Sequence, residues 1–466
     1  MQIPILNGIF SDGSPDFRTS YPVNLVPVPK STGIAEGYLR PADGIVKLGE
    51  GVGANRGGIA WRGTLYRVMG SDLVTVSQGG DVAVIGSVGS GGRVTFTYGF
   101  DHLAVTSGGR LYLYDGTTLA QVDDPDLGTA LSVVWVDGYY MTTDGEFLVI
   151  TELNNPFAVD PLKYGSSESD PDPIKALLKL RNEIYALNRN TIEVFSNVGS
   201  PNFPFNRITG AQIQKGTLGP HTCCVYGEAI AFMGSGGNES LSVYIAVNGT
   251  AQKIATREIE DVLGQYTEAQ LESVFMQERT QGSHQFLEIH LPDQTIVFDA
   301  AATQSLGDAV WFTLRSSTTG LGRWQVCDAV WCYDRWNVCK PGAPDVGYLD
   351  KDVASHWGET VGWEFGTMIT YNEGRGAIFH EVELVCLTGR VAFGSDPTVW
   401  TSYSTDGLTY SMEKPVKAGR QGEYAKRISW LQQGHMRNWR LQKFRGNSDA
   451  RLAIARLEAR IEPLNF

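Results

Sequence analysis

The stretch Val136-Asp-Gly-Tyr-Tyr-Met-Thr-Thr-Asp-Gly-Glu-Phe-Leu-Val-Ile150 decides the fold, because it joins apolar and aromatic strands through tight polar turns. The same unit recurs on both sides of it. The other copies are, in chain order, Trp61–Val68, Phe100–Val105 with Arg110–Asp115, Leu180–Leu187 with Thr191–Phe195, Glu228–Met233 with Ser242–Ala246, Gln285–Leu291 with Thr295–Asp299, and Arg335–Cys339 with Val346–Asp350. A repeat of about 40 to 50 residues with about four short strands is typical of a β-propeller.

The repeat predicts an all-β fold in which residues 51–357 form one propeller of six or seven blades. The blade number stays open because the last copy, Arg335–Asp350, is degenerate. A single blade cannot bury its apolar face, so the copies must pack radially around a common axis. Such a repeat defines a scaffold and does not by itself define a chemistry.

The segment before the repeats predicts an extended N-terminal arm over residues 1–50. Within it, Tyr21–Lys30 carries three prolines in eight residues. Proline removes a hydrogen-bond donor and holds the preceding residue in an extended conformation. An apolar arm of this kind lies either on its own domain or on a neighbouring subunit. We expect deletion of residues 1–40 to spare the fold and to abolish attachment to a partner.

Two further segments depart from the repeat. Residues 256–278 have a helical pattern, and Thr267 with Gln270 fits a capping box, which predicts two short inserted helices. After residue 358 the pattern changes to alternating apolar and polar residues, which predicts a compact β-sandwich over residues 358–466. Asp406-Gly407 predicts a hairpin turn between Trp400–Ser404 and Thr409–Met412.

The composition excludes several classes of protein. The chain has 466 residues, 42% of them hydrophobic, and a formal net charge of −13, which argues against a protein that coats nucleic acid. We expect no membrane insertion, because no run of apolar residues is long enough to span a bilayer. The start of the chain lacks the pattern of a secretory signal, and the six cysteines are sparse. The simplest expectation is synthesis in a reducing cytosol.

The sequence contains none of the common catalytic motifs: no nucleophile elbow, no Walker loop, no HExxH and no dinucleotide fingerprint. None of the seven histidines lies in a catalytic motif; they are His102, His221, His284, His290, His356, His380 and His435. We therefore expect a protein that is not an enzyme, with no catalytic residues, no cofactor and no metal.

Three cysteines and a histidine form the strongest candidate for a metal site. Cys327, Cys332 and Cys339 lie near His356 in the sequence, and three thiolates with one imidazole can bind zinc. Their spacing is looser than that of a zinc knuckle, and buried cysteines commonly act as small apolar residues. Core packing is therefore the favoured interpretation. The acidic pairs Asp123-Asp124 and Asp170 with Asp172 are weaker candidates for calcium, and solvated turns are favoured.

Aromatic residues raise three other possibilities. Trp311, Trp324, Trp331 and Trp336 could stack on sugars, although packing between blades is favoured. Ser404–Tyr410 is similar to the Asp-box of sialidase propellers, but here Asp406 and Gly407 are adjacent, so a plain turn is favoured. Lys426–Arg445 interleaves basic and aromatic residues, which suits single-stranded nucleic acid, an acidic protein partner, or simply a strand pair of the sandwich.

The chain resembles the packaged-DNA stabilisation proteins, also called tail accessory factors or tail hubs, of short-tailed bacteriophages. The matching segments share their order over nearly the whole chain. They are Tyr21–Leu25, Gly37–Ile45, Ile192–Phe195, Ile259–Leu263, Tyr266–Leu271, Leu287–Ala300, Ser404–Tyr410, and the strands from Arg427 to Arg440.

The resemblance implies a structural protein of the virion, synthesised in the bacterial host cytoplasm. Members attach as a hexamer below the portal ring after DNA packaging. They help to close the DNA channel, to retain the packaged DNA until genome ejection, and to dock a tail needle or plug and tailspikes. DNA passes through the ring without sequence-specific binding. For this chain, the arm over 1–50 and the helices within 256–278 are the expected assembly contacts.

Two other functions stay open on the sequence alone. One is a carbohydrate-binding or glycoside-hydrolysing β-propeller, which would need an aromatic cleft with paired carboxylates. The other is a cellular adaptor propeller that binds peptides and stays monomeric. A tail hub should instead self-associate or bind a portal.

Overall fold

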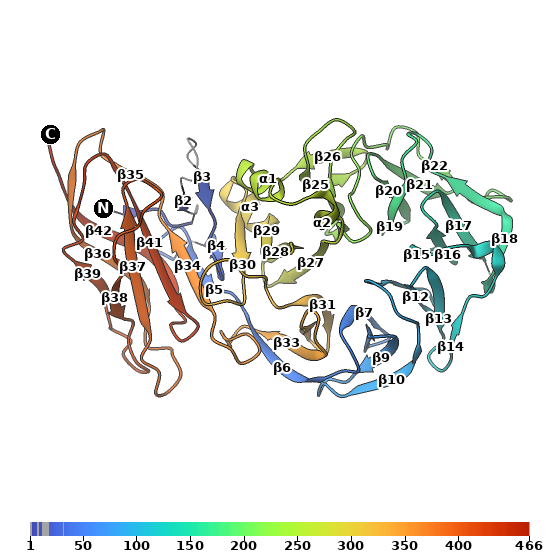
Figure 1. Cartoon of the computed structure of the whole chain (residues 1–466), viewed down its shortest axis with the longest axis horizontal. Coiled ribbons are helices and arrows are strands. Elements are labelled where there is room, and N and C mark those ends of the chain that lie inside the picture. The colour runs from blue at the N-terminus through green and yellow to red at the C-terminus, as the bar shows by residue number, and fades with distance from the viewer. Residues whose placement is uncertain (1, 7–8, 12–17, 31, 154, 466) are drawn as a thin grey trace.

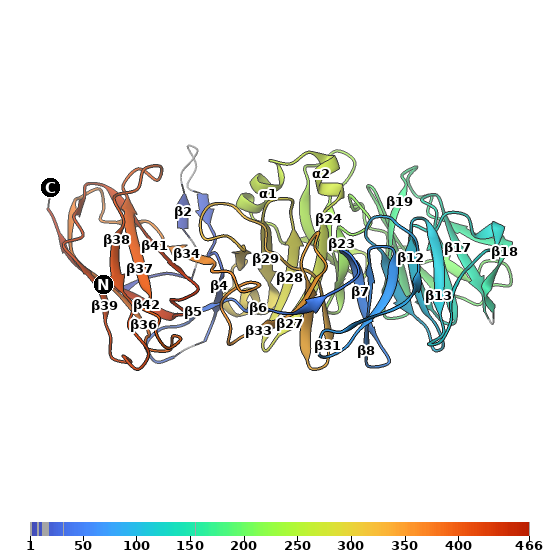
Figure 2. The same cartoon turned by 60° about the horizontal axis from the view of Figure 1, so that its bottom comes forward.

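The computed structural model describes residues 2–6, 9–11, 18–30, 32–153 and 155–465, with the backbone alone at 9–11 and 18–20. The chain forms a propeller and a β-sandwich side by side, with N-terminal strands between them (Figures 1 and 2). This architecture confirms the predicted all-β fold. Among the described residues, seven four-stranded antiparallel sheets form the seven blades of the propeller.

The blades follow the chain in order. Blade 1 is β7 (Asn55–Trp61), β8 (Thr64–Met69), β9 (Asp72–Val76) and β10 (Val82–Ser87). Blade 2 is β11 (Thr95–Tyr98), β12 (Leu103–Ser107), β13 (Arg110–Tyr114) and β14 (Leu119–Gln121). Blade 3 is β15 (Ser132–Val136), β16 (Tyr139–Thr143), β17 (Phe147–Glu152) and β18 (Asn155–Ser166). Blade 4 is β19 (Ile174–Leu180), β20 (Glu183–Asn188), β21 (Ile192–Asn197) and β22 (Phe205–Arg207).

Blade 5 is β23 (Cys223–Tyr226), β24 (Ala229–Gly234), β25 (Ser242–Val247) and β26 (Thr250–Lys253). Blade 6 is β27 (Phe275–Gln281), β28 (His284–His290), β29 (Thr295–Asp299) and β30 (Trp311–Leu314). Blade 7 is β31 (Cys327–Cys332), β32 (Arg335–Cys339), β33 (Asp345–Asp350) and β6 (Gly44–Glu50). The first strand of each blade contacts the first strand of the next, so these strands surround the propeller axis.

Local sequence explains why each unit folds as it does. In blade 3, Val136 pairs directly with Tyr139, so Asp137-Gly138 is a two-residue hairpin loop. Both loop residues have positive φ, 47° and 93°, as such a loop requires. The flanking strands alternate buried residues toward the neighbouring blades, and Val136, Met141 and Leu148 are fully buried.

Blade 7 is closed by a strand from the start of the chain. The edge strand β6 (Gly44–Glu50) pairs antiparallel with β33, with Tyr348 opposite Val46. The sequence predicted an arm through residue 50, whereas the last seven residues of that segment form this propeller strand. The last repeat looks degenerate in the sequence because its fourth strand, β6, lies about 300 residues before the other three.

Short helices lie beside the blades. They are α1 (Arg257–Leu263), α2 (Glu268–Glu272), α3 (Ala300–Leu306) and the 3-10 turn η1 (Pro125–Leu127). The capping box of Thr267 and Gln270 is confirmed in α2. The inserted helices end before the predicted limit of 278, because β27 begins at Phe275. The part of the chain that the structure describes has no helix with the length and apolarity needed to cross a membrane.

The sandwich consists of two sheets that enclose one apolar core. One sheet contains β39 (Ile428–Leu431), β36 (Ala377–Leu387), β42 (Ala453–Pro463), β5 (Tyr38–Pro41) and β4 (Leu25–Val28), with β1 (Gln2–Ile3) on β42 and β40 (His435–Met436) on β36. The other contains β34 (Gly362–Gly366), β41 (Trp439–Asn447), β37 (Thr398–Ser404) and β38 (Lys414–Lys417), with β35 (Thr370–Tyr371) on β41. Phe365, Phe444 and Leu457 are fully buried in this core.

The predicted arm is therefore shared between both domains. β4 and β5 belong to the sandwich, and Leu25 and Leu39 are buried in its core. The pair β2 (Ile9–Ser11) and β3 (Arg18–Ser20) forms a separate two-stranded sheet. Deletion of residues 1–40 would remove β1, β4 and most of β5 from the sandwich, so the expectation that this deletion spares the fold is wrong. The domain limits at residues 50 and 357 stay predictions.

Candidate functional site at the junction of the domains

The chain crosses between propeller and sandwich at Asn24, and this residue ties three segments together. Its Nδ2 donates to the carbonyl oxygens of Arg315, at 2.9 Å, and of Gly362, at 2.7 Å. Its Oδ1 accepts from the backbone nitrogen of Arg315 at 3.0 Å. Arg315 follows the last strand of blade 6, and Gly362 begins the sandwich. Asn24 has φ 54°, a conformation that asparagine adopts more readily than most residues.

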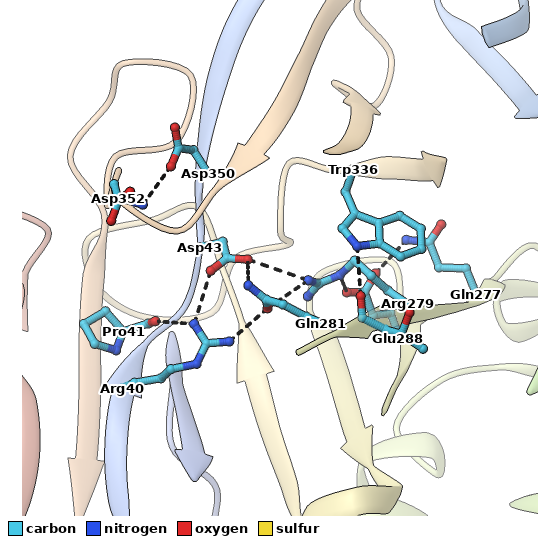
Figure 3. A network of polar contacts seen from close by, with 11 residues as sticks. Arg40, Pro41, Asp43, Gln277, Arg279, Gln281, Glu288, Trp336, Asp350 and Asp352 are labelled. Atoms are coloured by element: carbon cyan, nitrogen blue, oxygen red, sulfur yellow. Dashed lines mark hydrogen bonds and ion pairs between the residues drawn. The ribbon is translucent and has the colours of Figure 1, made fainter. Parts of the chain in front are cut away.

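A buried polar network extends this junction into blade 6 (Figure 3). Arg40 lies in β5 and donates to Asp43 Oδ1 at 3.2 Å and to Gln281 Oε1 at 2.9 Å. Gln281 also donates to the second oxygen of Asp43. Arg279 donates to Gln281 Oε1 at 3.3 Å and to Glu288 Oε1 at 2.5 Å. The N-terminal segment is thus bonded to the end of β27.

The charges in this network are buried and paired. The Arg279 side chain is 4% exposed and that of Glu288 is 0% exposed. Gln277 donates to the other oxygen of Glu288 at 2.6 Å. Burial alone would raise the pKa of Glu288, but Arg279, His290 and Gln277 together lower it to about 2. Glu288 is therefore ionised at neutral pH, and its charge is compensated by Arg279.

His356, proposed as a metal ligand from its place in the sequence, lies in the junction instead. Its Nδ1 lies 2.7 Å from Ser316 Oγ, and its backbone bridges to Ile45 of β6. The nearby backbone of Gly44 donates to the carbonyl of Val353 at 2.8 Å. Burial lowers the pKa of His356 to about 4, so its ring is neutral at physiological pH. Its role is to hold the segment between the domains against the N-terminal strand.

The predicted assembly segments meet at α1. The hydroxyl of Tyr21, at the start of the junction, lies 2.6 Å from Thr256 Oγ1 just before this helix. Ile259 and Leu263 are buried against blades 5 and 6. The arm and the inserted helices, which the sequence singled out separately, thus form one surface beside the junction.

The cysteine cluster packs in the core between blades 7 and 1. Cys327, Cys332 and Cys339 are buried and free, and the Cys327 thiol lies 3.4 Å from the carbonyl oxygen of Cys339. Burial raises the pKa of all three thiols, so the thiolate form that binds metals is disfavoured. Among the described residues, no group of three or more ligating side chains is placed to hold a metal ion.

The four tryptophans of the sugar-stacking hypothesis differ in how far they are exposed to solvent. Trp311 and Trp324 are each 1% exposed and belong to the core of blade 6 and its neighbours. Trp331 is 52% exposed and meets Trp336 edge to face at 5.4 Å. A stacking platform therefore has two members instead of four.

The other candidate motifs are turns and sandwich strands. Asp406 accepts from the backbone nitrogens of Leu408 and Thr409, at 2.9 and 2.8 Å, and closes the turn after β37. The hairpin partner is β38 from Lys414, whereas the sequence predicted Thr409–Met412. In the basic stretch, Trp430 and Phe444 are buried in the sandwich core, so their rings face away from any nucleic acid.

The acidic pairs also stabilise turns. Asp124 caps η1 by accepting from the backbone of Asp126, and its other oxygen accepts from Val159 at 3.0 Å. Asp172 accepts from the backbone nitrogens of Asn190 and Thr191.

The junction itself was not predicted from the sequence. Its local signals were polar residues within apolar segments, namely Asn24 and the pair of Arg40 and Asp43.

Comparison with known proteins agrees with this architecture. The family model described as "Bacteriophage P22 Gp10, beta-propeller" matches residues 1–354, and "Bacteriophage P22 Gp10, beta-sandwich" matches residues 362–462. The tail hub protein gp10 of Salmonella phage P22 is 27% identical over 489 aligned positions, which cover 99% of both chains.

Solved structures give weaker likenesses. PorZ of Porphyromonas gingivalis has 11% identity and a TM-score of 0.41, over 80% of this chain and 46% of that one. The Pan2 WD40 domain of Neurospora crassa has 8% identity and a TM-score of 0.42, over 66% of this chain and 95% of that one. Likeness at this level identifies neither a family nor a function. The two family matches span nearly the whole chain in the order of its two domains, and the resemblance inferred from the sequence is confirmed: the chain belongs to the bacteriophage P22 Gp10 family.

Proposed function

We propose that this chain is a structural subunit of a phage tail hub. The observation that carries the proposal is its relation over 99% of both chains to a protein named as a tail hub, with both domains in the same order. The subunit is part of the virion tail and is made in the bacterial host cytoplasm. It has no catalytic role in this proposal.

The junction supports a role that needs a rigid connection between the two domains. Propeller and sandwich are connected by hydrogen bonds at Asn24, Arg40 and His356, from segments at both ends of the sequence. Buried and paired polar groups allow little motion between the parts they join. A subunit of this kind transmits force from one domain to the other instead of bending at a linker.

In the full proposal, six copies attach as a ring below the portal and help to close the DNA channel. The ring docks the tail needle or plug and the tailspikes. Packaged DNA passes through it at ejection without sequence-specific binding. The net charge of −13 favours passage of DNA through the ring over binding of DNA to it, because a negative protein repels the phosphates.

Mass measurement in solution tests the proposal, with the protein alone and mixed with the portal ring of the same genome. We expect a stable complex with about six copies on each ring, because tail rings are symmetric assemblies. A chain that stays monomeric and ignores the portal would overturn the proposal. The carbohydrate alternative then becomes the next to test, with the pair Trp331 and Trp336 as its candidate contact.

A further inference from the structure

A second polar cluster lies where the inner strands begin, at the propeller axis. Arg93 lies two residues before β11 of blade 2, yet its guanidinium pairs with Asp328 in β31 of blade 7. The same guanidinium lies 3.9 Å from the ring centre of Phe275, the first residue of β27 in blade 6. Blade 2 is next to blades 1 and 3, so these contacts reach across the axis. We name Arg93, Phe275, His290, Arg323 and Asp328 the axial cluster.

Aromatic rings hold the cations of the axial cluster in place. The His290 ring stacks on Phe275 with centres 4.1 Å apart and planes at 7°. Since His290 covers one face of Phe275, Arg93 covers the other. Arg323 lies 5.8 Å from the same ring centre. Two guanidinium groups are therefore kept beside one aromatic ring, which a cation–π contact favours for each of them.

The cluster has more positive than negative groups. The oxygens of Asp328 accept from Arg93 and, at 2.5 Å, from Asn55 Nδ2. Arg323 forms no side-chain hydrogen bond or ion pair with any residue that the structure describes. Glu288, the nearest carboxylate to His290 at 3.8 Å, is already bonded to Arg279 and Gln277. One guanidinium thus lacks a counter-charge.

Several buried polar atoms of the cluster also lack a partner. They are Nε of Arg93, Nε of Arg323, Nε1 of Trp324 and both ring nitrogens of His290, judged against the described residues. Buried polar atoms in proteins nearly always have a hydrogen-bond partner, so each exception asks for an explanation. The arginine and tryptophan atoms are all donors. Water would satisfy donors but would not balance the charge of Arg323.

We propose that the axial cluster binds a small oxyanion, of the phosphate or carboxylate class, with Arg323 and Arg93 as its charged partners. Guanidinium groups bind such anions through paired, charge-assisted hydrogen bonds. Solvent reaches the site, because the Arg93 side chain is 24% exposed and that of Asp328 is 12% exposed. This inference does not depend on the tail-hub proposal.

Titration of the purified protein with inorganic phosphate by calorimetry, at constant ionic strength in chloride, tests the inference. A parallel titration with acetate distinguishes phosphate from carboxylate as the preferred anion. We expect saturable binding of at least one of the two. Binding of neither anion would overturn the inference.

The decisive variant is Arg323→Gln, because this side chain forms no hydrogen bond with the residues that the structure describes and its removal should leave the structure intact. We expect it to weaken anion binding about tenfold or more, since a charge-assisted hydrogen bond is lost. Arg323→Lys keeps the charge and should retain part of the affinity. Arg420→Gln, at a 69% exposed position of the sandwich, is the matched control and should bind as the unaltered protein does. Equal affinity of Arg323→Gln and the control would contradict the proposal.

Discussion

The junction network contains the buried Arg279 of blade 6, whereas the axial cluster contains the partly buried Arg93 and Arg323, and the two sites differ in how these charges are compensated. In the junction, Arg279 has Glu288 at 2.5 Å, and every oxygen of Glu288 is bonded. At the axis, Arg93 and Arg323 lie beside one carboxylate, Asp328. The two sites are connected, because the Arg279 guanidinium lies 5.8 Å from the Trp324 ring that stacks on His290.

The difference separates a structural use of buried charge from a binding use. A buried ion pair is costly to break, because the remaining partner keeps its charge in a poor solvent. A partly buried cation without a counter-charge instead lowers the stability of the fold, and a bound anion can relieve that cost. Substitution of Glu288 should therefore destabilise the fold strongly, whereas substitution of Arg323 should hardly change its stability.

The largest effect is expected for Glu288→Gln. Arg279 would keep only the more distant carboxylate of Asp43, 3.8 Å away, and loss of the close member of a buried pair costs about 3–5 kcal/mol. Urea unfolding monitored by tryptophan fluorescence measures the change. Glu228→Gln, which breaks the exposed pair with Arg181, is the control and should unfold as the unaltered protein does. Equal losses in both variants would remove the distinction between buried and exposed pairs.

Asn24→Ala should come next, with a loss of about 2–3 kcal/mol. It removes three hydrogen bonds between the domains and leaves buried carbonyl and amide groups without partners. Asn24→Gly loses the same bonds but relieves the positive φ, so it should cost about 1 kcal/mol less. Scanning calorimetry should also show the two domains unfolding in separate transitions. A single transition in both variants would mean that other contacts couple the domains.

Acid should weaken the junction through His356. Its pKa of about 4 in the folded protein lies below the ordinary 6.5, so the unfolded chain takes up the proton first. Stability that is complete above pH 6.5 is therefore lost as the pH falls toward 4, on the order of 2 kcal/mol for this group. His356→Gln should flatten the slope of unfolding free energy against pH between 6.5 and 4. His221, with its pKa also lowered to about 4, keeps part of the slope in that variant.

The smallest effect is expected for Arg323→Gln without added anion. Removal of an uncompensated cation near Arg93 should leave stability unchanged or raise it by less than about 1 kcal/mol. Urea unfolding in chloride alone gives the value for direct comparison with Glu288→Gln. A loss of several kcal/mol would show that Arg323 has a structural partner, and the contrast between the two sites would fail.

The propeller and the sandwich were predictable from sequence because their signals are local. Asp137-Gly138 marks its own hairpin, and Thr267 with Gln270 marks its own helix start. The junction was not predictable in this way. Asn24 bonds to residues about 290 and 340 positions later, and Arg40 to one about 240 later. No periodic pattern records contacts of this length, because each depends on how complete domains meet.

The axial cluster was also not predictable, because it too depends on contacts between segments that are far apart in the sequence. Arg93 and Arg323 lie in different linkers between blades and Phe275 begins β27, and only closure of the ring brings the three together. His290 lies in no catalytic motif of the sequence, and the structure places its ring between Phe275 and Trp324. The residues that surround His290 could not be predicted without the number of blades. That number was uncertain because the fourth strand of blade 7 comes from the start of the chain.

The strand β6 has a consequence for the order of synthesis. The ribosome makes this strand before the first blade, but its partner β33 emerges only after about 300 further residues. Until then β6 is an unpaired sheet edge, and β4 and β5 wait still longer for the sandwich. A chain that terminates early can close neither domain. The topology therefore acts as a check on complete synthesis, because a truncated subunit has neither a closed propeller nor a complete sandwich.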